Sequence, residues 1–388
     1  MNNILKVLTS GESHGKCLNA IIEGIPAGIS ISVEKINYEL WRRQQGYGRG
    51  ARMKIESDKA EIKSGVRHGI TTGAPICLEI KNKDYENWKT VMSTEKVDLT
   101  DKDVIKLIEE KKFTKLRPGH ADWAGSQKYK FNDLRDVLER SSARKTAIEV
   151  AVGAIAKQVL SNFNIEGFST ISQIGKIKNV KQNNNLKEIK ELSEKSEVRC
   201  WDAETSELMK IEIDNAKENG DTLGGAFEIY FENVPIGLGS YVHYDRAIDG
   251  KIAQAVMSIP AVKSVEIGAG SQSAELMGSE MHDSFYLENK KIVRKTNNAG
   301  GIEGGITNGE TLVIKGTMKP IPTMKTPLPT VDIKNMKEDF AHFERSDACA
   351  VPACAVVAEA RIAVVILDEF LRKFGGDSLE ELKAHYEY

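Results

Sequence analysis

Residues 139–146, with the sequence ERSSARKT, combine residue types that suit anion binding. The segment holds two natural N-caps and two arginines: Ser141, Ser142, Arg140 and Arg144. It precedes residues 147–160, which are rich in alanine and valine and which we expect to form a buried helix. A helix start offers free backbone N–H groups and a partial positive charge, so arginines there oppose the dipole unless an anion lies between them. The alternative is an ordinary capped helix with solvated arginines.

Two histidines lie in glycine-bounded loops, His14 in residues 11–15 and His120 in residues 117–122. Histidine carries protons near neutral pH, so each is a candidate acid or base, although each alone could be a structural residue. HExxH and Cys/His clusters are absent from the sequence, which argues against metal-dependent hydrolysis, and Ser13 next to His14 is not a catalytic triad by itself. Histidines together with arginines suit a small substrate with several negative charges.

A third group of basic residues lies in residues 42–52, where glycines would let the backbone wrap a ligand. Its arginines include Arg43, Arg49 and Arg52. An Arg/Gly segment that binds RNA, or a solvated loop, would have the same composition. The net charge of −2 argues against nucleic acid, because it gives the protein no global field that attracts a polyanion.

The chain has 388 residues and five cysteines without CxxC spacing, which predicts reduced thiols and no structural zinc. Its N-terminus lacks a signal-peptide pattern. The most apolar run, residues 350–367, contains Glu359 and Arg361, so we expect a buried helix rather than a membrane span. These features predict a soluble, cytoplasmic protein.

Three local patterns occur twice in the same order and indicate an internal duplication. Residues 24–28 match 233–237, residues 69–73 match 305–309, and residues 139–143 match 344–348. Residues 139–143 and residues 344–348 each precede a long segment rich in alanine and valine that we expect to be a helix. With strands expected around these helices, the sequence predicts an α+β fold: a β-α-β sandwich with duplicated halves around a central pair of buried helices. We expect one domain over 1–388, pseudo-repeats at about 1–165 and 205–373, and peripheral insertions at about 83–112 and 176–197. GxGxxG before a helix and the P-loop motif are both absent.

Taken together, these blocks resemble chorismate synthase over essentially the whole chain. The resemblance rests on residues 11–15, 46–50, 117–122, 139–154 and 345–347. It implies conversion of 5-enolpyruvylshikimate 3-phosphate to chorismate and phosphate, an anti-1,4-elimination that requires reduced FMN without net redox change. It also implies a homotetramer and a β-α-β sandwich.

The resemblance further implies roles for individual residues. His14 would lie near the leaving phosphate, His120 near the flavin ring, and Asp347 near flavin N5 in a proton relay. The substrate-binding positions are Arg43, Arg49, Arg52, Arg117 and Arg144, of which Arg43 and Arg49 also match NADPH positions. The flavin-binding positions are Arg140, Ser141, Ser142, Pro260, Ala261, Gly304, Lys319, Pro320, Ile321, Pro322, Thr323 and Arg345.

Two other functions remain as alternatives at the level of sequence. An NADPH-dependent flavin reductase could be the main activity, and NADPH alone would then bleach bound FMN. A non-enzymatic RNA-binding protein could use residues 42–52, and its binding would depend steeply on salt.

Overall fold

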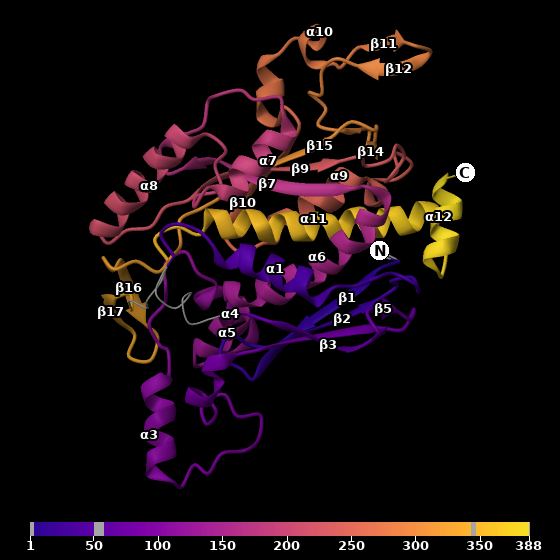
Figure 1. The fold of residues 1–388 in the computed structure, drawn as a ribbon. Coiled ribbons are helices and arrows are strands. Elements are labelled where there is room, and N and C mark those ends of the chain that lie inside the picture. The colour runs from indigo at the N-terminus through magenta and orange to yellow at the C-terminus, as the bar shows by residue number, and fades with distance from the viewer. Residues whose placement is uncertain (1–3, 50–57, 343–346, 388) are drawn as a thin grey trace.

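The computed structural model describes residues 4–49, 58–342 and 347–387, and it is a mixed helix-and-sheet structure. The predicted site residues Arg52 and Arg345 lie outside the described residues. Two sheets enclose a layer of helices (Figure 1). The helix layer contains α1 (Val33–Gln44), α6 (Thr146–Leu160), α9 (Ile248–Met257) and α11 (Val351–Phe374).

Both sheets are antiparallel throughout. The first has the order β1 (Lys6–Ser10), β2 (Cys17–Glu23), β6 (Ile76–Lys81), β3 (Ala60–Ser64). The second has the order β10 (Val262–Ile267), β15 (Leu312–Met318), β9 (Gly225–Glu232), β7 (Glu166–Ile174), β8 (Ile177–Lys178). Alternate residues of β6 and β9 are buried, as expected for strands with one face toward the helices.

Smaller elements surround these layers. The helices are α3 (Lys102–Lys111), α4 (Asp122–Tyr129), α5 (Arg135–Ser141), α7 (Leu186–Lys195), α8 (Ala203–Glu218), α10 (Gly278–Met281) and α12 (Leu379–Glu387). Short hairpins are β4 (Val66–Arg67) with β5 (Ile70–Thr71), β11 (Phe285–Glu288) with β12 (Lys291–Arg294), β13 (Ile302–Glu303) with β14 (Ile306–Thr307), and β16 (Pro329–Asp332) with β17 (Lys337–Phe340). Among the described residues, no helix is long and apolar enough to cross a membrane.

The start of α6 differs from its predicted form. The helix itself begins at Thr146, one residue before the prediction. Ser141 was expected to cap it but is the last residue of α5, where its hydroxyl donates to the carbonyl of Val137 at 2.6 Å. Ser142 does act as a cap, accepting from the N–H of Arg144 at the start of a short 3₁₀ turn, Ala143–Lys145. The sequence pattern predicted only the start of α6 in this segment, and the structure also places the end of α5 there.

The entries to α1 and α9 share one hydrogen-bond pattern. In each, a threonine hydroxyl donates to the carbonyl of a proline at 2.6 Å. The same hydroxyl accepts the backbone N–H of the residue three positions after that proline, at 2.9 Å before α1 and at 2.8 Å before α9. The residues are Thr71, Pro26 and Ile29 before α1, and Thr307, Pro235 and Leu238 before α9. Both threonines belong to the repeated patterns noted in the sequence.

The centre of the helix layer is the contact between α6 and α11, which lie side by side (Figure 1). Gly153 faces Ala360 so closely that a Cβ on Gly153 would lie 2.4 Å from the Cβ of Ala360 and 2.6 Å from its Cα. The absence of a side chain therefore sets the separation of the two helices.

We predict that Gly153→Ala lowers the free energy of unfolding by about 1–3 kcal/mol, because the added methyl forces the helices apart. The matched control is Gly250→Ala in the first turn of α9, where the nearest atom to a new Cβ is 4.0 Å away. That variant should be stabilised by up to about 1 kcal/mol through helix propensity. Urea-induced unfolding measures both, and equal effects would contradict the close-contact model.

A buried ion network adjoins this helix contact. Glu359 of α11 is fully buried and accepts from Arg42 at 2.9 and 3.1 Å, from the Ser169 hydroxyl at 2.7 Å, and from Lys157. Arg42 also donates to Glu194 of α7 at 3.2 Å. The network thus connects α1, α6, α7, α11 and β7. Burial of such charges is tolerated because each is paired and hydrogen-bonded.

Glu194 gives this network a testable pH dependence. Burial raises its pKa, but hydrogen bonds and charges from Arg199 and Arg42 outweigh burial and lower the pKa to about 2. Because the folded pKa lies below the usual 4.5, the carboxylate stabilises the fold above about pH 4.5, and this contribution is lost as the pH falls toward 2. Glu194→Gln should therefore destabilise most at neutral pH, and the difference from wild type should shrink on acidification. Glu110→Gln, on the exposed face of α3, is the control and should show little effect at any pH.

Candidate functional site

The loop that carries His14 joins β1 to β2 and is held in place by polar contacts. The Asn82 side-chain amide donates to the carbonyls of Glu12 and Gly15 at 3.1 and 2.7 Å. Gly11 has a φ of +101°, and a Cβ there would lie 2.2 Å from the carbonyl oxygen of Cys17. Glycine is required at that turn because no larger residue fits it.

The His14 ring is fixed by Glu139 and Trp88. Its Nδ1 lies 2.8 Å from Glu139 Oε1, and its backbone N–H donates to Glu139 Oε2 at 2.7 Å. The indole of Trp88 packs on the imidazole with ring centroids 4.1 Å apart. Burial raises the pKa of Glu139, but the hydrogen bonds and charges of His14 and Arg135 outweigh it and leave that pKa below its usual value.

Two predicted substrate-binding arginines meet at the start of α6. Arg144 donates to Asp58 at 2.6 Å and to the Asn82 carbonyl oxygen at 2.9 and 3.0 Å. Arg43 donates to the Thr146 hydroxyl at 3.0 Å and lies 3.9 Å from Asp58. Both guanidinium groups are buried, and Asp58 supplies the negative charge between them. Asn82 links this cluster to the His14 loop.

Arg140 lies on the other side of the same loop. Its guanidinium donates to the carbonyls of Thr9 and Gly11 at 2.8 and 2.9 Å. In this structure it therefore anchors the end of β1 to α5. The sequence had placed it in a cofactor site without indicating this backbone contact.

His120 belongs to a second charged group, formed within residues 117–122. Arg117 donates to both carboxylate oxygens of Asp122 at 2.8 Å, and His120 Nδ1 lies 2.6 Å from Asp122 Oδ1. Burial raises the pKa of Asp122, but hydrogen bonds from Arg117 and His120 outweigh it and hold that pKa well below its usual value. Nη2 of Arg117 lies 3.0 Å from the same Nδ1, so a carboxylate that only accepts and a guanidinium that only donates both face this nitrogen of His120.

The predicted flavin residues 319–323 lie beside the His120 loop. The Lys319 amine donates to the carbonyl of Gly119, and its backbone N–H donates to Ala261 at 2.9 Å. Ala261 has a φ of +72°, which is strained for an alanine. Burial, together with the nearby charge of Lys263, lowers the pKa of Lys319. Lys263 is exposed and Lys319 is half-buried, and an anion beside them would offset their mutual repulsion.

The remaining predicted residues are in two other places. Asp347 pairs with Arg49 at 3.3 Å, and both side chains are largely buried. Gly304 lies near the start of α9, because the neighbouring Gly305 carbonyl accepts from Ile248. Pro260 follows the far end of that ten-residue helix, about 15 Å away by the helix rise. Gly304 and Pro260 therefore lie at opposite ends of α9.

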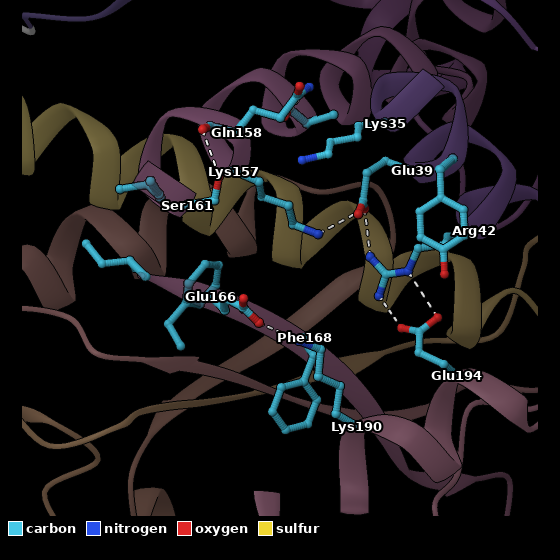
Figure 2. Close-up of a pocket in the computed structure, with 16 residues that line it drawn as sticks. Lys35, Glu39, Arg42, Lys157, Gln158, Ser161, Glu166, Phe168, Lys190 and Glu194 are labelled. Atoms are coloured by element: carbon cyan, nitrogen blue, oxygen red, sulfur yellow. Dashed lines mark hydrogen bonds and ion pairs between the residues drawn. The ribbon is translucent and has the colours of Figure 1, made fainter. Parts of the chain in front are cut away.

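A cavity of about 350 Å³ lies between α1, α6, α7 and β7, and Figure 2 shows its lining. Lys35 points into it, while Arg42, Lys157 and Glu194 form its charged wall and Phe168 belongs to its apolar part. None of the predicted site residues that the structure describes lines this cavity. The described residues also contain no group of three or more His, Cys, Asp or Glu that could hold a metal ion.

A family model described as chorismate synthase matches residues 5–371 of this chain. The chain belongs to the chorismate synthase family. It is 52% identical to a chorismate synthase of Alkaliphilus metalliredigens, with 98% of each chain covered, and 51% identical to one of Geobacter sulfurreducens, with 99% of this chain and 98% of the other covered. A crystal structure of a chorismate synthase matches with a TM-score of 0.79 at 42% identity, covering 99% of this chain and 96% of that one. The chain is therefore an enzyme of the lyase class, acting in the shikimate pathway on a small-molecule substrate.

Several residues that contact the predicted site residues were missed from sequence. They are Asp58, Asn82, Trp88, Arg135 and, as a partner of His14, Glu139. Trp88 falls in the segment expected to be peripheral, where a tryptophan among polar residues was the available signal. Asp58, Asn82 and Glu139 look like ordinary polar residues, because their partners are distant in the chain. Arg135 and Glu139 are four residues apart and would be taken for an ordinary helical ion pair.

Asn82 provides a direct test of how the His14 loop is held. We predict that Asn82→Ala lowers turnover by about 10-fold or more, because the loop and Arg144 lose their common anchor. Asn87→Ala is the control, since Asn87 is exposed and bonds only to Asp84 in the described residues. Steady-state kinetics measures both. Equal turnover of the two variants would show that Asn82 does not position the loop.

Proposed function

We propose that this chorismate synthase family member converts 5-enolpyruvylshikimate 3-phosphate to chorismate and phosphate by anti-1,4-elimination, with reduced FMN required. The observation that carries the proposal is the pairing of His14 with Glu139 beside the buried arginines at the start of α6. A substrate with a phosphate and two carboxylates needs such cations, and a departing phosphate needs a proton or a hydrogen-bond donor. In this assignment His14 serves the leaving phosphate.

The arginines Arg43, Arg49, Arg52, Arg117 and Arg144 are proposed to hold the anionic groups of the substrate. Arg43 and Arg144 already share Asp58, so binding exchanges part of that pairing for the substrate's own charges. Such an exchange limits the cost of desolvating two buried cations when the site is empty. Arg43 and Arg49 are also the proposed contacts for NADPH.

The residues present fit a flavin mononucleotide. Lys319 with Lys263 nearby favours a phosphate, and residues 260–261, 319–323 and the His120 loop form one connected surface. Arg140, Ser141, Ser142, Gly304 and Arg345 are proposed as further contacts. Bound in its reduced form, FMN supplies electron density to the allylic system as the C–O bond breaks. His120 is proposed to stabilise charge at the ring and Asp347, paired with Arg49, to take part in the proton relay.

We also infer that the two halves arose by duplication and form a β-α-β sandwich around α6 and α11. The matched threonine–proline contacts before α1 and α9 support this reading, because independent loops would not share both bonds. A homotetramer is proposed from the family. Leu8 and Ile21, cross-strand neighbours on the first sheet and 72% and 48% exposed, suit a subunit contact.

The function is tested by an anaerobic assay with substrate and dithionite-reduced FMN, following phosphate release. We predict that His14→Ala and His120→Ala each lower turnover by roughly 10-fold or more, while FMN and substrate still bind through the arginines. In addition, His120→Ala should change the protonation spectrum of bound reduced flavin, whereas His14→Ala should not.

The matched control is His243→Ala, since that histidine is 57% exposed and pairs with the exposed Asp245. It should turn over at the wild-type rate. Wild-type turnover by both site variants would show that the histidines are structural. Bleaching of bound FMN by NADPH alone, without phosphate release from the substrate, would favour the flavin reductase instead.

A further inference from the structure

Glu139 contacts the His14 loop at three points. One carboxylate oxygen lies 2.8 Å from Nδ1 of His14, the other accepts its backbone N–H at 2.7 Å, and the Glu139 carbonyl accepts the N–H of Ser13 at 2.9 Å. Ring and backbone are thus held by the same residue. Glu139 is 3% exposed, so water does not compete strongly for its oxygens.

The hydrogen-bond chemistry of this contact determines which ring nitrogen carries a proton. Arg135 donates to Glu139 Oε1 at 3.2 Å, and its charge and that of His14 favour an ionised carboxylate. An ionised carboxylate is an acceptor only, so Nδ1 must be the donor. Nε2 has no hydrogen-bond partner among the described residues. The neutral ring is therefore Nδ1–H, with its lone pair on Nε2.

Trp88 restricts the ring from its face. The centroids of the indole and the imidazole are 4.1 Å apart at 34°. The indole is held by Arg135 at 4.8 Å and Lys111 at 4.7 Å from its ring centroid, and by its N–H, which donates to Asp84 at 2.9 Å. A packed face prevents the imidazole from rotating about its Cβ–Cγ bond, which would exchange Nδ1 for a carbon at Glu139. Face contact and edge contact together define a single ring orientation.

We propose that Glu139 is a positioning residue that fixes His14 as the Nδ1–H tautomer, with Trp88 clamping the ring, so that Nε2 is the atom that exchanges protons with the departing phosphate. The proposal rests on the proposed function for the identity of the acceptor. In the step, the Nε2–H bond of the imidazolium breaks and an O–H bond forms on the phosphate. The electron pair stays on Nε2, and the ring left behind is the neutral Nδ1–H form, still donating to Glu139. Solvent returns the proton before the next turnover.

The first test reads the tautomer directly. Enzyme labelled with ¹⁵N-histidine, without substrate or flavin, gives imidazole ¹⁵N shifts that distinguish Nδ1–H from Nε2–H, and His14→Gln assigns the signal. Wild-type enzyme at high pH should show neutral His14 as Nδ1–H. Free histidine prefers Nε2–H, so an Nε2–H signal in the wild type overturns the proposal whether or not any variant folds.

The second test uses Glu139→Gln, which keeps the shape but whose amide can donate to Nδ1 as well as accept from it. We predict a mixture of tautomers in the spectrum and a kcat lowered about 10-fold or more, with KM changed much less. Glu139→Asp, which keeps an acceptor-only group, should retain Nδ1–H and recover part of the rate. Glu380→Gln, at an exposed position of α12, is the control and should leave both readouts unchanged.

These outcomes distinguish a failure of the tautomer assignment from a failure of the proposed function. A slow Glu139→Gln enzyme whose His14 is still wholly Nδ1–H would make Glu139 a merely structural support and overturn the inference, while the proposed function would stand. A wild-type enzyme that shows Nδ1–H but releases no phosphate would refute the proposed function and leave the tautomer assignment intact.

Discussion

The close contact of α6 with α11 at Gly153 and Ala360 is the constraint on which the rest of the structure depends. Helices this near leave no room for large side chains between them, which is why both are dominated by alanine and valine at their shared face. The residue beside Ala360 is Glu359, whose charge is then fully buried. An unpaired carboxylate there would be very costly, so Arg42, Lys157 and Ser169 must converge on it from α1, α6 and β7.

This convergence also positions the candidate site. Arg42 is fixed by Glu359, and the next residue along α1, Arg43, is thereby directed to the start of α6, where it binds Thr146 and approaches Asp58. Asp58 holds Arg144, and Arg144 shares Asn82 with the His14 loop. A series of polar contacts thus runs from the buried helix pair to a candidate acid. Apart from the 3.9 Å approach of Arg43 to Asp58, these steps are hydrogen bonds, so a small displacement of α1 would be passed to the loop.

The sequence predicts a feature well when the residues that determine it are close together in the chain. The extent of α6 depends on neighbours three or four residues away, and the structure confirms it within one residue. The Arg117–His120–Asp122 group could also be seen as a block, because it lies within six residues. The prediction that Ser141 caps α6 is wrong, because α5 extends to that residue. Arg144 looked like a cation awaiting an anion because its partner, Asp58, is 86 residues away and no pattern connects the two.

His14 and His120 make the same kind of contact through residues from different parts of the chain. Each places Nδ1 on a carboxylate that an arginine also binds: Glu139 with Arg135 for His14, and Asp122 with Arg117 for His120. For His14 the carboxylate can only accept, so the proton is on Nδ1 and Nε2 is the atom left for chemistry. In the His120 group Arg117 also faces both ring nitrogens, at 3.0 and 3.5 Å. The His120 set is contained in one loop and can form wherever that loop folds. The His14 set needs β1, α5 and Trp88 together, so its orientation depends on the assembled helix layer and is secured only when the whole fold is in place.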